Sequence, residues 1–239
     1  MVIYNNNQGV SGTSISLNGQ SVTINTGSNA NLKQYRINER KSVQFTDIRT
    51  IRIDSSIATI TFKRHIDPNV TGYLHGTGNL ERPVKLEMEA RNRELYIRAN
   101  YHGVGIGNSI NLDVYVPDRV IGAICVNTSS GNVFIKDNIN VTQISINTQS
   151  GNVVVDSKAA SMNVNTMSGG INIGVFTTRP INLNCASMSG GISIVTRNVG
   201  TIQLNAKTQS GMIQNLHRST QGFMANMNIS TMGGGIIVR

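Results

Sequence analysis

Clustered carboxylates are the first residues to look for, because hydrolases and lyases use them for acid–base chemistry or to bind calcium. The part of the chain after Arg119 contains two acids, Asp137 and Asp156. They occupy the same place in two successive copies of a repeat described below, so stacked copies would bring them about 5 Å apart, close enough to share a cation. Because Lys136 and Lys158 stand near them, we interpret the pair as a solvated corner.

Histidine, cysteine and glycine offer no catalytic pattern. The histidines are too scattered for metal-ligand spacing. They are His65, His75, His102 and His217. Cys125 and Cys185 have neither a CxxC partner nor a nearby histidine, and we expect them not to pair with each other. The run 103–107 (GVGIG) matches no phosphate-binding motif and no helical pattern follows it. The sequence therefore predicts no catalytic, cofactor-binding or metal-binding residue, and a protein that is not an enzyme.

Basic side chains are the best candidate contact for an anionic partner. The formal net charge is +9 and the sequence pI is near 9.9, which favours phosphates, anionic glycans or acidic surfaces. A local cluster, with Tyr35 and Phe45 interleaved, consists of Lys33, Arg36, Arg40, Lys41, Arg49 and Arg52. Glu39 and Asp47 dilute its charge, so a solvated loop is the alternative interpretation.

Composition limits the elements that position these residues. Hydrophobic residues make up 38% of the chain, aromatics make up 5%, tryptophan is absent and glycine occurs 24 times. Glycine and asparagine, both abundant, tolerate positive φ and supply turn chemistry. This composition predicts many short strands with tight turns and few helices.

A short turn motif, [T/S]-x-[S/G]-G-x-[V/I], recurs through the second half of the chain. Its copies begin at Thr128, Thr148, Thr166, Ser187, Thr208 and Thr231. The motif glycines are 20, 18, 21, 21 and 23 residues apart. Each turn is flanked by alternating apolar and polar residues, the pattern of half-buried strands. Repetition at this spacing indicates an array of similar structural units.

Aligned copies give vertical columns of like residues, which we expect to form the interior. Two columns lie before the turn. The first is Ile124, Ile144, Met162, Leu183, Leu204 and Met227, and the second is Val126, Ile146, Val164, Cys185, Ala206 and Ile229. After the turn the column is Val133, Val153, Ile171, Ile192, Ile213, Ile236. An outward column, able to form a ladder of side-chain amides, is Asn163, Asn184, Asn205 and Asn228.

These columns favour coils stacked in parallel over consecutive antiparallel hairpins, because each coil of a solenoid buries its apolar face against its neighbours. The Ser-Gly pair is then expected at a corner, with glycine adopting a strained dihedral and Thr or Ser bonding the turn backbone. The register also predicts that Val164 and Ile171 point inward while Asn163 and Asn172 point outward.

The first half shows the same alternation without the turn motif. Residues 13–24 read as a hairpin with Asn18-Gly19 at its tip, and residues 26–41 as a polar loop or linker. Further strands are predicted at 48–53, 58–62, 84–88, 94–97 and 110–117. The predicted organisation is a hairpin and linker over 1–44, an irregular first part of a β-solenoid over 45–119, and the six-copy repeat over 120–239.

The order of these segments resembles a known family. The segments are IRTIRIDSSIATITF, a short variable loop, LEMEARNRELYIRA, INLDVYVPDRV and the SGNV or SGGI turns. From about Ile48 to Arg239 they look like the bacterial "putative adhesin" β-solenoid family of unknown function, which is related to toast-rack domains. The resemblance implies an all-β fold, a right-handed single-stranded parallel β-helix with a partly antiparallel N-terminal region, no cofactor and no assigned catalytic residues.

The compartment is predicted from what the sequence lacks. It has no secretory signal pattern and no apolar run long enough for a membrane span, and its two cysteines do not form a disulfide framework. We therefore expect an intracellular protein, cytoplasmic, or nuclear in a host cell if it is viral.

The C-terminal residues Ile236, Ile237 and Val238 are expected to form an uncovered strand edge, because no capping segment follows the sixth copy. Such an edge predicts a homo-oligomer.

Two functions remain open at this point. The first is a non-catalytic scaffold or interaction module that presents a rigid surface to a protein or glycan partner. The alternative is an intracellular basic protein that associates with nucleic acid.

Overall fold

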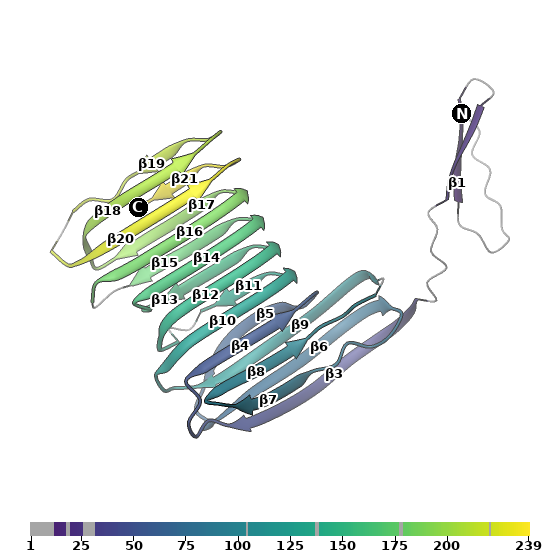
Figure 1. Cartoon of the computed structure of the whole chain (residues 1–239), viewed down its shortest axis with the longest axis horizontal. Coiled ribbons are helices and arrows are strands. Elements are labelled where there is room, and N and C mark those ends of the chain that lie inside the picture. Colours follow the sequence, from purple (N-terminus) through teal and green to yellow (C-terminus); the bar gives the residue numbers. More distant parts are fainter. Residues whose placement is uncertain are drawn as a thin grey trace.

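The computed structural model describes residues 12–17, 20–25, 32–103, 105–136, 139–176, 179–219 and 221–239. These residues form strands and turns, with no helix among them. The strands make one two-stranded, one nine-stranded and one ten-stranded sheet (Figure 1). The predicted all-β fold is confirmed, whereas the right-handed single-stranded helix stays a prediction.

The two-stranded sheet is the predicted hairpin. Its strands, β1 (Gly12–Leu17) and β2 (Gln20–Asn25), pair antiparallel. The tip residues Asn18 and Gly19 lie outside the described residues.

The nine-stranded sheet, called sheet 1 here, is parallel except at one end, where β7 runs antiparallel to β8. In spatial order its strands are β18 (Val199–Thr208), β20 (Phe223–Thr231), β16 (Ile181–Ser189), β14 (Ser161–Ser168), β12 (Val141–Ser150), β10 (Ile121–Ser130), β4 (Thr50–Ser55), β8 (Glu94–Ala99) and β7 (Glu87–Arg91).

The ten-stranded sheet, sheet 2, is parallel from β19 to β9 and ends in an antiparallel pair. Its order is β19 (Ile213–Asn215), β21 (Ile236–Val238), β17 (Ile192–Arg197), β15 (Ile171–Phe176), β13 (Val153–Ser157), β11 (Val133–Ile135), β5 (Thr59–His65), β9 (Gly105–Pro117), β6 (Asn69–Leu80) and β3 (Lys33–Gln44).

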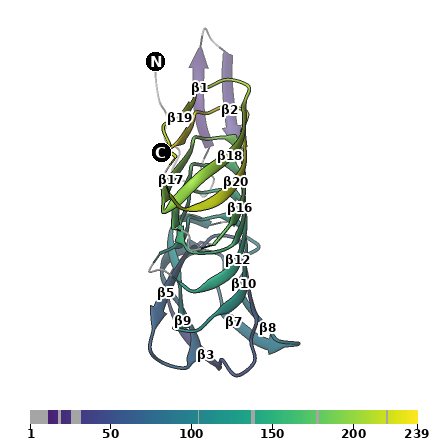
Figure 2. The ribbon, with the colours of Figure 1, turned by 90° about the vertical axis from the view of Figure 1, so that its left-hand side faces the viewer.

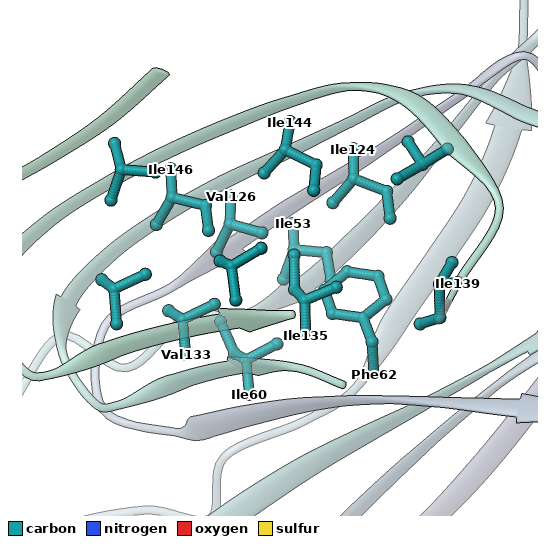
Figure 3. Packing of buried hydrophobic residues seen from close by; sticks show 14 of the residues in the cluster. Ile53, Ile60, Phe62, Ile124, Val126, Val133, Ile135, Ile139, Ile144 and Ile146 are labelled. Atoms are coloured by element: carbon teal, nitrogen blue, oxygen red, sulfur yellow. The ribbon is translucent and has the colours of Figure 1, made fainter. Parts of the chain in front are cut away.

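Each coil of the repeat joins one strand of sheet 1 to one strand of sheet 2 through the motif turn. The predicted columns form the interior except in the coil β18–β19, where Ile213 is exposed and Leu204 and Ala206 are partly buried. Ile124 pairs with Ile144, and Val133 with Val153, so the coils stack in register. The side chains of Ile124, Ile144 and Val133 meet between the two sheets, and Ile139 lies at one side of them (Figure 3). Val164 and Ile171 are buried while Asn163 and Asn172 are exposed, which confirms the predicted alternation.

The motif glycines are required because successive coils come very close at the corner. A Cβ on Gly151 would lie 2.2 Å from the carbonyl oxygen of Gly131, and one on Gly169 would lie 2.2 Å from that of Gly151. The expected strained dihedral is therefore not the general reason for glycine here. Among the described motif glycines, Gly169 has a positive φ (149°), whereas the contact with the preceding coil recurs through the column.

The coils do not stack in the order of the sequence. The coil β20–β21, which is the last in the chain, lies between β16–β17 and β18–β19 (Figures 1 and 2). At the other end, β4–β5 lies between β8–β9 and β10–β11. The prediction that Ile236, Ile237 and Val238 form a free edge is therefore wrong, because β21 pairs with both β17 and β19.

The physical reason for this order lies in the apolar columns. In β21 the inward residues Ile236 and Val238 are fully buried. The matching residues of β19 are Ile213 and Asn215, and asparagine in an apolar column is costly to enclose. The coil that carries Asn215 therefore occupies the end of the stack, where its side chain stays exposed.

Two strands were missed by the sequence analysis. Most of the predicted polar linker after residue 26 is instead the first part of β3, in which Tyr35, Ile37 and Val43 face inward. Glu39 interrupts that apolar pattern, and its carboxylate accepts a hydrogen bond from the Leu86 backbone N–H at 2.8 Å. The predicted variable loop holds β6, where glycines weaken the strand signal.

Within the described part of the chain, no helix is long and apolar enough to cross a membrane.

Candidate functional site

A groove of about 1410 Å³ follows the corner where the strands of sheet 1 end, and it runs along the stack of coils. Its floor is the column of motif Thr and Ser residues, which are buried except for the half-buried Thr208 of the end coil. The residues before and after this column, such as Asn147 and Gln149, are both exposed and form the two walls. Because one motif is repeated in each coil, the groove presents the same positions again and again to a ligand.

The hydroxyl groups of the floor serve the fold. Several donate to the glycine carbonyl of the neighbouring coil: Ser187 to Gly169 at 3.3 Å, Thr231 to Gly190 at 3.0 Å and Thr208 to Gly234 at 3.0 Å. The hydroxyl oxygens of Thr128, Thr148 and Thr166 are enclosed without a hydrogen-bond partner among the described residues. Since these hydroxyls are turned away from solvent, the walls are the surface that a ligand would meet.

One wall carries a directional ladder of side-chain amides. Nδ2 of Asn165 donates to Oδ1 of Asn147 at 3.0 Å, and Nδ2 of Asn147 donates to Oδ1 of Asn127 at 3.2 Å. The ladder ends where Nδ2 of Asn127 donates to the carboxylate of Asp54 at 3.0 Å. The next residue in this column is Ala186, so the ladder stops and this half of the groove, from Asp54 to Asn165, is polar.

The other wall becomes apolar at the coil of Asn165. The second position of the motif is Met167, Met188 and Met232 in three adjacent coils, and these side chains are 53%, 50% and 46% exposed. Methionine is flexible and polarisable, so it adapts to irregular apolar partners. The groove therefore has a polar amide half and a methionine half. The methionine column could not be predicted from the motif, because the second motif position varies between copies.

Three of the four predicted outward asparagines also form a ladder, outside the groove, whereas Oδ1 of Asn163 accepts from Asn165 Nδ2 at 3.4 Å. Asn228 donates to Asn184 at 3.1 Å, and Asn205 donates to Asn228 at 3.4 Å. The spatial order of Asn205 and Asn228 is reversed relative to the sequence, as the order of their coils requires.

The six predicted basic residues do not form one patch. Arg36 and Arg40 lie on the exposed face of β3, whereas Lys33 and Lys41 alternate with them on the other face of the same strand. Arg49 precedes β4, and Arg52 lies on β4 in sheet 1. The cluster in the sequence is thus divided between two sheets.

Arg52 is also paired within the protein. Its Nε and Nη2 donate to the two carboxylate oxygens of Glu94 at 2.9 Å each, and the hydroxyl of Tyr96 also donates to Glu94. The hydrogen bond to Glu94 raises the pKa of Arg52, and the bonds from Arg52 and Tyr96 lower the pKa of Glu94 to about 2. Both side chains stay ionised, so the Arg52–Glu94 pair is neutral overall and offers little net attraction to an anionic partner.

A charge cluster that the sequence analysis did not identify lies on the outer face of sheet 2. Asp113 on β9 accepts from Lys63 Nζ at 2.8 Å and lies 3.3 Å from His75 Nε2. The hydrogen bond to Asp113 is the main cause of the raised pKa of Lys63. Tyr73 stacks on His75, with ring centroids 4.5 Å apart. Since the side chain of Asp113 is 11% exposed and satisfied by two partners, we interpret the cluster as structural.

The other sequence candidates form no reaction centre among the residues that the structure describes. Asp137 lies outside the described residues, so its proposed pairing with Asp156 is not described. Among the described residues, no three His, Cys, Asp or Glu side chains gather to hold a metal ion. Cys125 and Cys185 are free thiols, as expected, and burial raises the pKa of Cys185 to about 12.

Comparison with known proteins places the chain in a family. Residues 48–236 match the model of the family described as Toastrack DUF4097. The chain belongs to this toastrack family. The expected resemblance to the adhesin-like toast-rack group is therefore confirmed, and that group is one of unknown function.

Solved structures are similar to this chain at low sequence identity. A putative cell adhesion protein from Clostridium sporogenes is 11% identical, with a TM-score of 0.57 over 85% of this chain and 99% of that one. A putative adhesin from Parabacteroides distasonis is 12% identical, with a TM-score of 0.36 over 84% and 97%. The first of these supports a shared fold. No curated protein matches this toastrack chain in sequence.

Proposed function

We propose that this toastrack protein is a non-catalytic interaction module that binds a segment of a partner protein in the groove along its coils. The observation that carries the proposal is the column of Met167, Met188 and Met232, exposed side by side in a groove of about 1410 Å³. Exposed apolar side chains gathered in one place indicate a binding surface. The amide half of the groove supplies hydrogen-bonding groups for the polar part of the same segment.

The lining favours a protein over a glycan or a nucleic acid. Aromatic side chains, on which bases stack, are absent from the described lining of the groove. Its ionisable residues are Asp54 and His102 at one end and Lys207 at the other. Phosphate contacts depend on clusters of lysine and arginine, and the described lining has no such cluster. Flexible methionine surfaces, in contrast, suit apolar side chains of peptides.

The test uses peptides selected from a random phage-displayed library on the intact protein, with dissociation constants measured by calorimetry. We expect the triple variant Met167→Ser, Met188→Ser, Met232→Ser to bind a selected peptide about tenfold more weakly or worse, because each change removes apolar contact area. The single variant Met188→Ser is measured as well, and its matched control is Met224→Ser, since Met224 is 44% exposed, similar to Met188 at 50%, and lies outside the groove.

Three results would contradict the proposal. The first is a selected peptide whose affinity is unchanged in the triple variant. The second is a loss of affinity in Met224→Ser as large as the loss in Met188→Ser. The third is binding to a glycan array, with competition by the soluble glycan, when no peptide is selected. Each would require a different partner or a different surface.

A further inference from the structure

We propose that the exposed end of the stack, the coil β18–β19, is an interface for a second copy of this chain. Within the described residues, β18 pairs with β20 alone and β19 with β21 alone, so both strands have an unpaired edge. An unpaired edge presents backbone donors and acceptors to any strand that approaches it. This inference does not depend on what the groove binds.

The end coil also leaves part of the apolar column uncovered. Ile213 is 42% exposed, whereas its column neighbours Ile236 and Ile192 are 0% and 1% exposed. Leu204 is partly buried, while Met227 beneath it is 1% exposed. In the middle of the stack these positions are covered by the next coil, so the end coil exposes the surface on which a further coil would pack.

The opposite end of the stack is protected, which explains why a closed pair is expected instead of a fibre. The edge strands there are β3 in sheet 2 and β7 in sheet 1. β3 carries the basic residues Lys33, Arg36, Arg40 and Lys41, and β7 carries Glu87, Glu89 and Arg91. Charged side chains on an edge discourage strand addition. In β18 and β19 the sole charged residue is Lys207. Two such apolar ends meet as identical partners around a two-fold axis, and this contact closes on itself.

The sequence of β18 suits antiparallel pairing with itself. If the two-fold axis passes at Asn205, the inward residue Leu204 faces Ala206 of the second copy, so a large side chain meets a small one. Lys207 then faces the neutral Gln203 of the second copy, which avoids contact between like charges. The Asn205 amide donates one hydrogen bond to Asn228, and its remaining N–H and carbonyl can bond reciprocally with Asn205 of the second copy.

Sedimentation equilibrium on the full chain over the micromolar range tests this inference. We expect the parent to form a dimer and Asn205→Arg to raise the dimer dissociation constant at least about tenfold, because two like charges would meet on the axis. The control is Asn163→Arg, which places the same charge in an exposed outer column in the middle of the stack and should leave the dimer intact. Far-UV circular dichroism and the melting temperature are measured to check that both variants fold.

The inference is overturned by a parent that remains monomeric up to high micromolar concentration, by a dimer that Asn205→Arg does not weaken, or by equal weakening in Asn163→Arg. Species that keep growing with concentration would also overturn it, because they would show a head-to-tail contact. If Asn205→Arg proves unfolded, Leu204→Lys provides the same test at a side chain that is already partly exposed.

Discussion

Replacing Val164 by aspartate unfolds the stacked coils, whereas the same replacement one residue earlier, Asn163→Asp, is tolerated. Val164 has 0% exposure and packs in the column between Ile146 and Cys185. The variant loses the burial of an aliphatic side chain and encloses a carboxylate without a partner, so we expect a loss of at least about 4 kcal/mol in the free energy of unfolding. That is a large part of the stability of an ordinary domain.

Urea denaturation followed by circular dichroism measures this pair of variants. Asn163 is exposed, so Asn163→Asp should change the free energy of unfolding by less than about 1 kcal/mol. Similar midpoints for Val164→Asp and the parent would show that the strand faces are assigned incorrectly.

The second large effect is expected at the glycine column. A Cβ on Gly190 would lie 2.1 Å from the carbonyl oxygen of Gly169, which belongs to the backbone of the neighbouring coil. The Gly169 backbone has no room to move away, because it is in close contact with the next coil: a Cβ on Gly169 would lie 2.2 Å from the carbonyl oxygen of Gly151. We expect Gly190→Ala to cost about 3 kcal/mol of stability, by forcing two coils apart.

The adjacent residue supplies the control for this prediction. A Cβ on Gly191 would meet its nearest atom, the carbonyl oxygen of Gly235, at 3.5 Å, which is ordinary van der Waals contact. Gly191→Ala should therefore melt within a few degrees of the parent in calorimetry. Equal melting temperatures for the two alanine variants would refute the steric role of the column.

The repeat could be predicted from the sequence because corresponding positions of its copies carry similar residues. Each apolar column, such as the one from Ile124 to Met227, appears in the structure with the expected register. A one-residue slip would expose the whole apolar set, so the pattern leaves little freedom. The order of the coils is different, because any two copies of the motif can pair and similarity alone does not rank them.

The signals that were missed are local and physical. Asn215 stands where β21 has Val238, and this single polar residue marks the coil that cannot lie inside the stack. In β3, the inward Glu39 interrupts the apolar alternation that would indicate a strand. Its carboxylate is satisfied by the Leu86 backbone N–H, which is far away in the sequence. The groove was missed for a similar reason, since one wall consists of a motif position that varies between copies, with Gln149 and Met167 as examples.

The central claim is that the last copy of the motif inserts between the two copies before it, and engineered disulfides test it most directly. In a Cys125→Ser, Cys185→Ala background, one variant carries Asn184→Cys with Asn228→Cys and the other carries Asn184→Cys with Asn205→Cys. Asn184 pairs with Asn228, so their Cα atoms are about 4.8 Å apart, within the range of a disulfide. Asn205 lies one strand further, at about 9.6 Å, which is too far.

Mass spectrometry of the oxidised, unreduced proteins gives the answer. We predict a disulfide between positions 184 and 228 and free thiols in the 184 and 205 variant. A disulfide between 184 and 205, with free thiols at 184 and 228, would contradict the account, because it would show coils stacked in the order of the sequence.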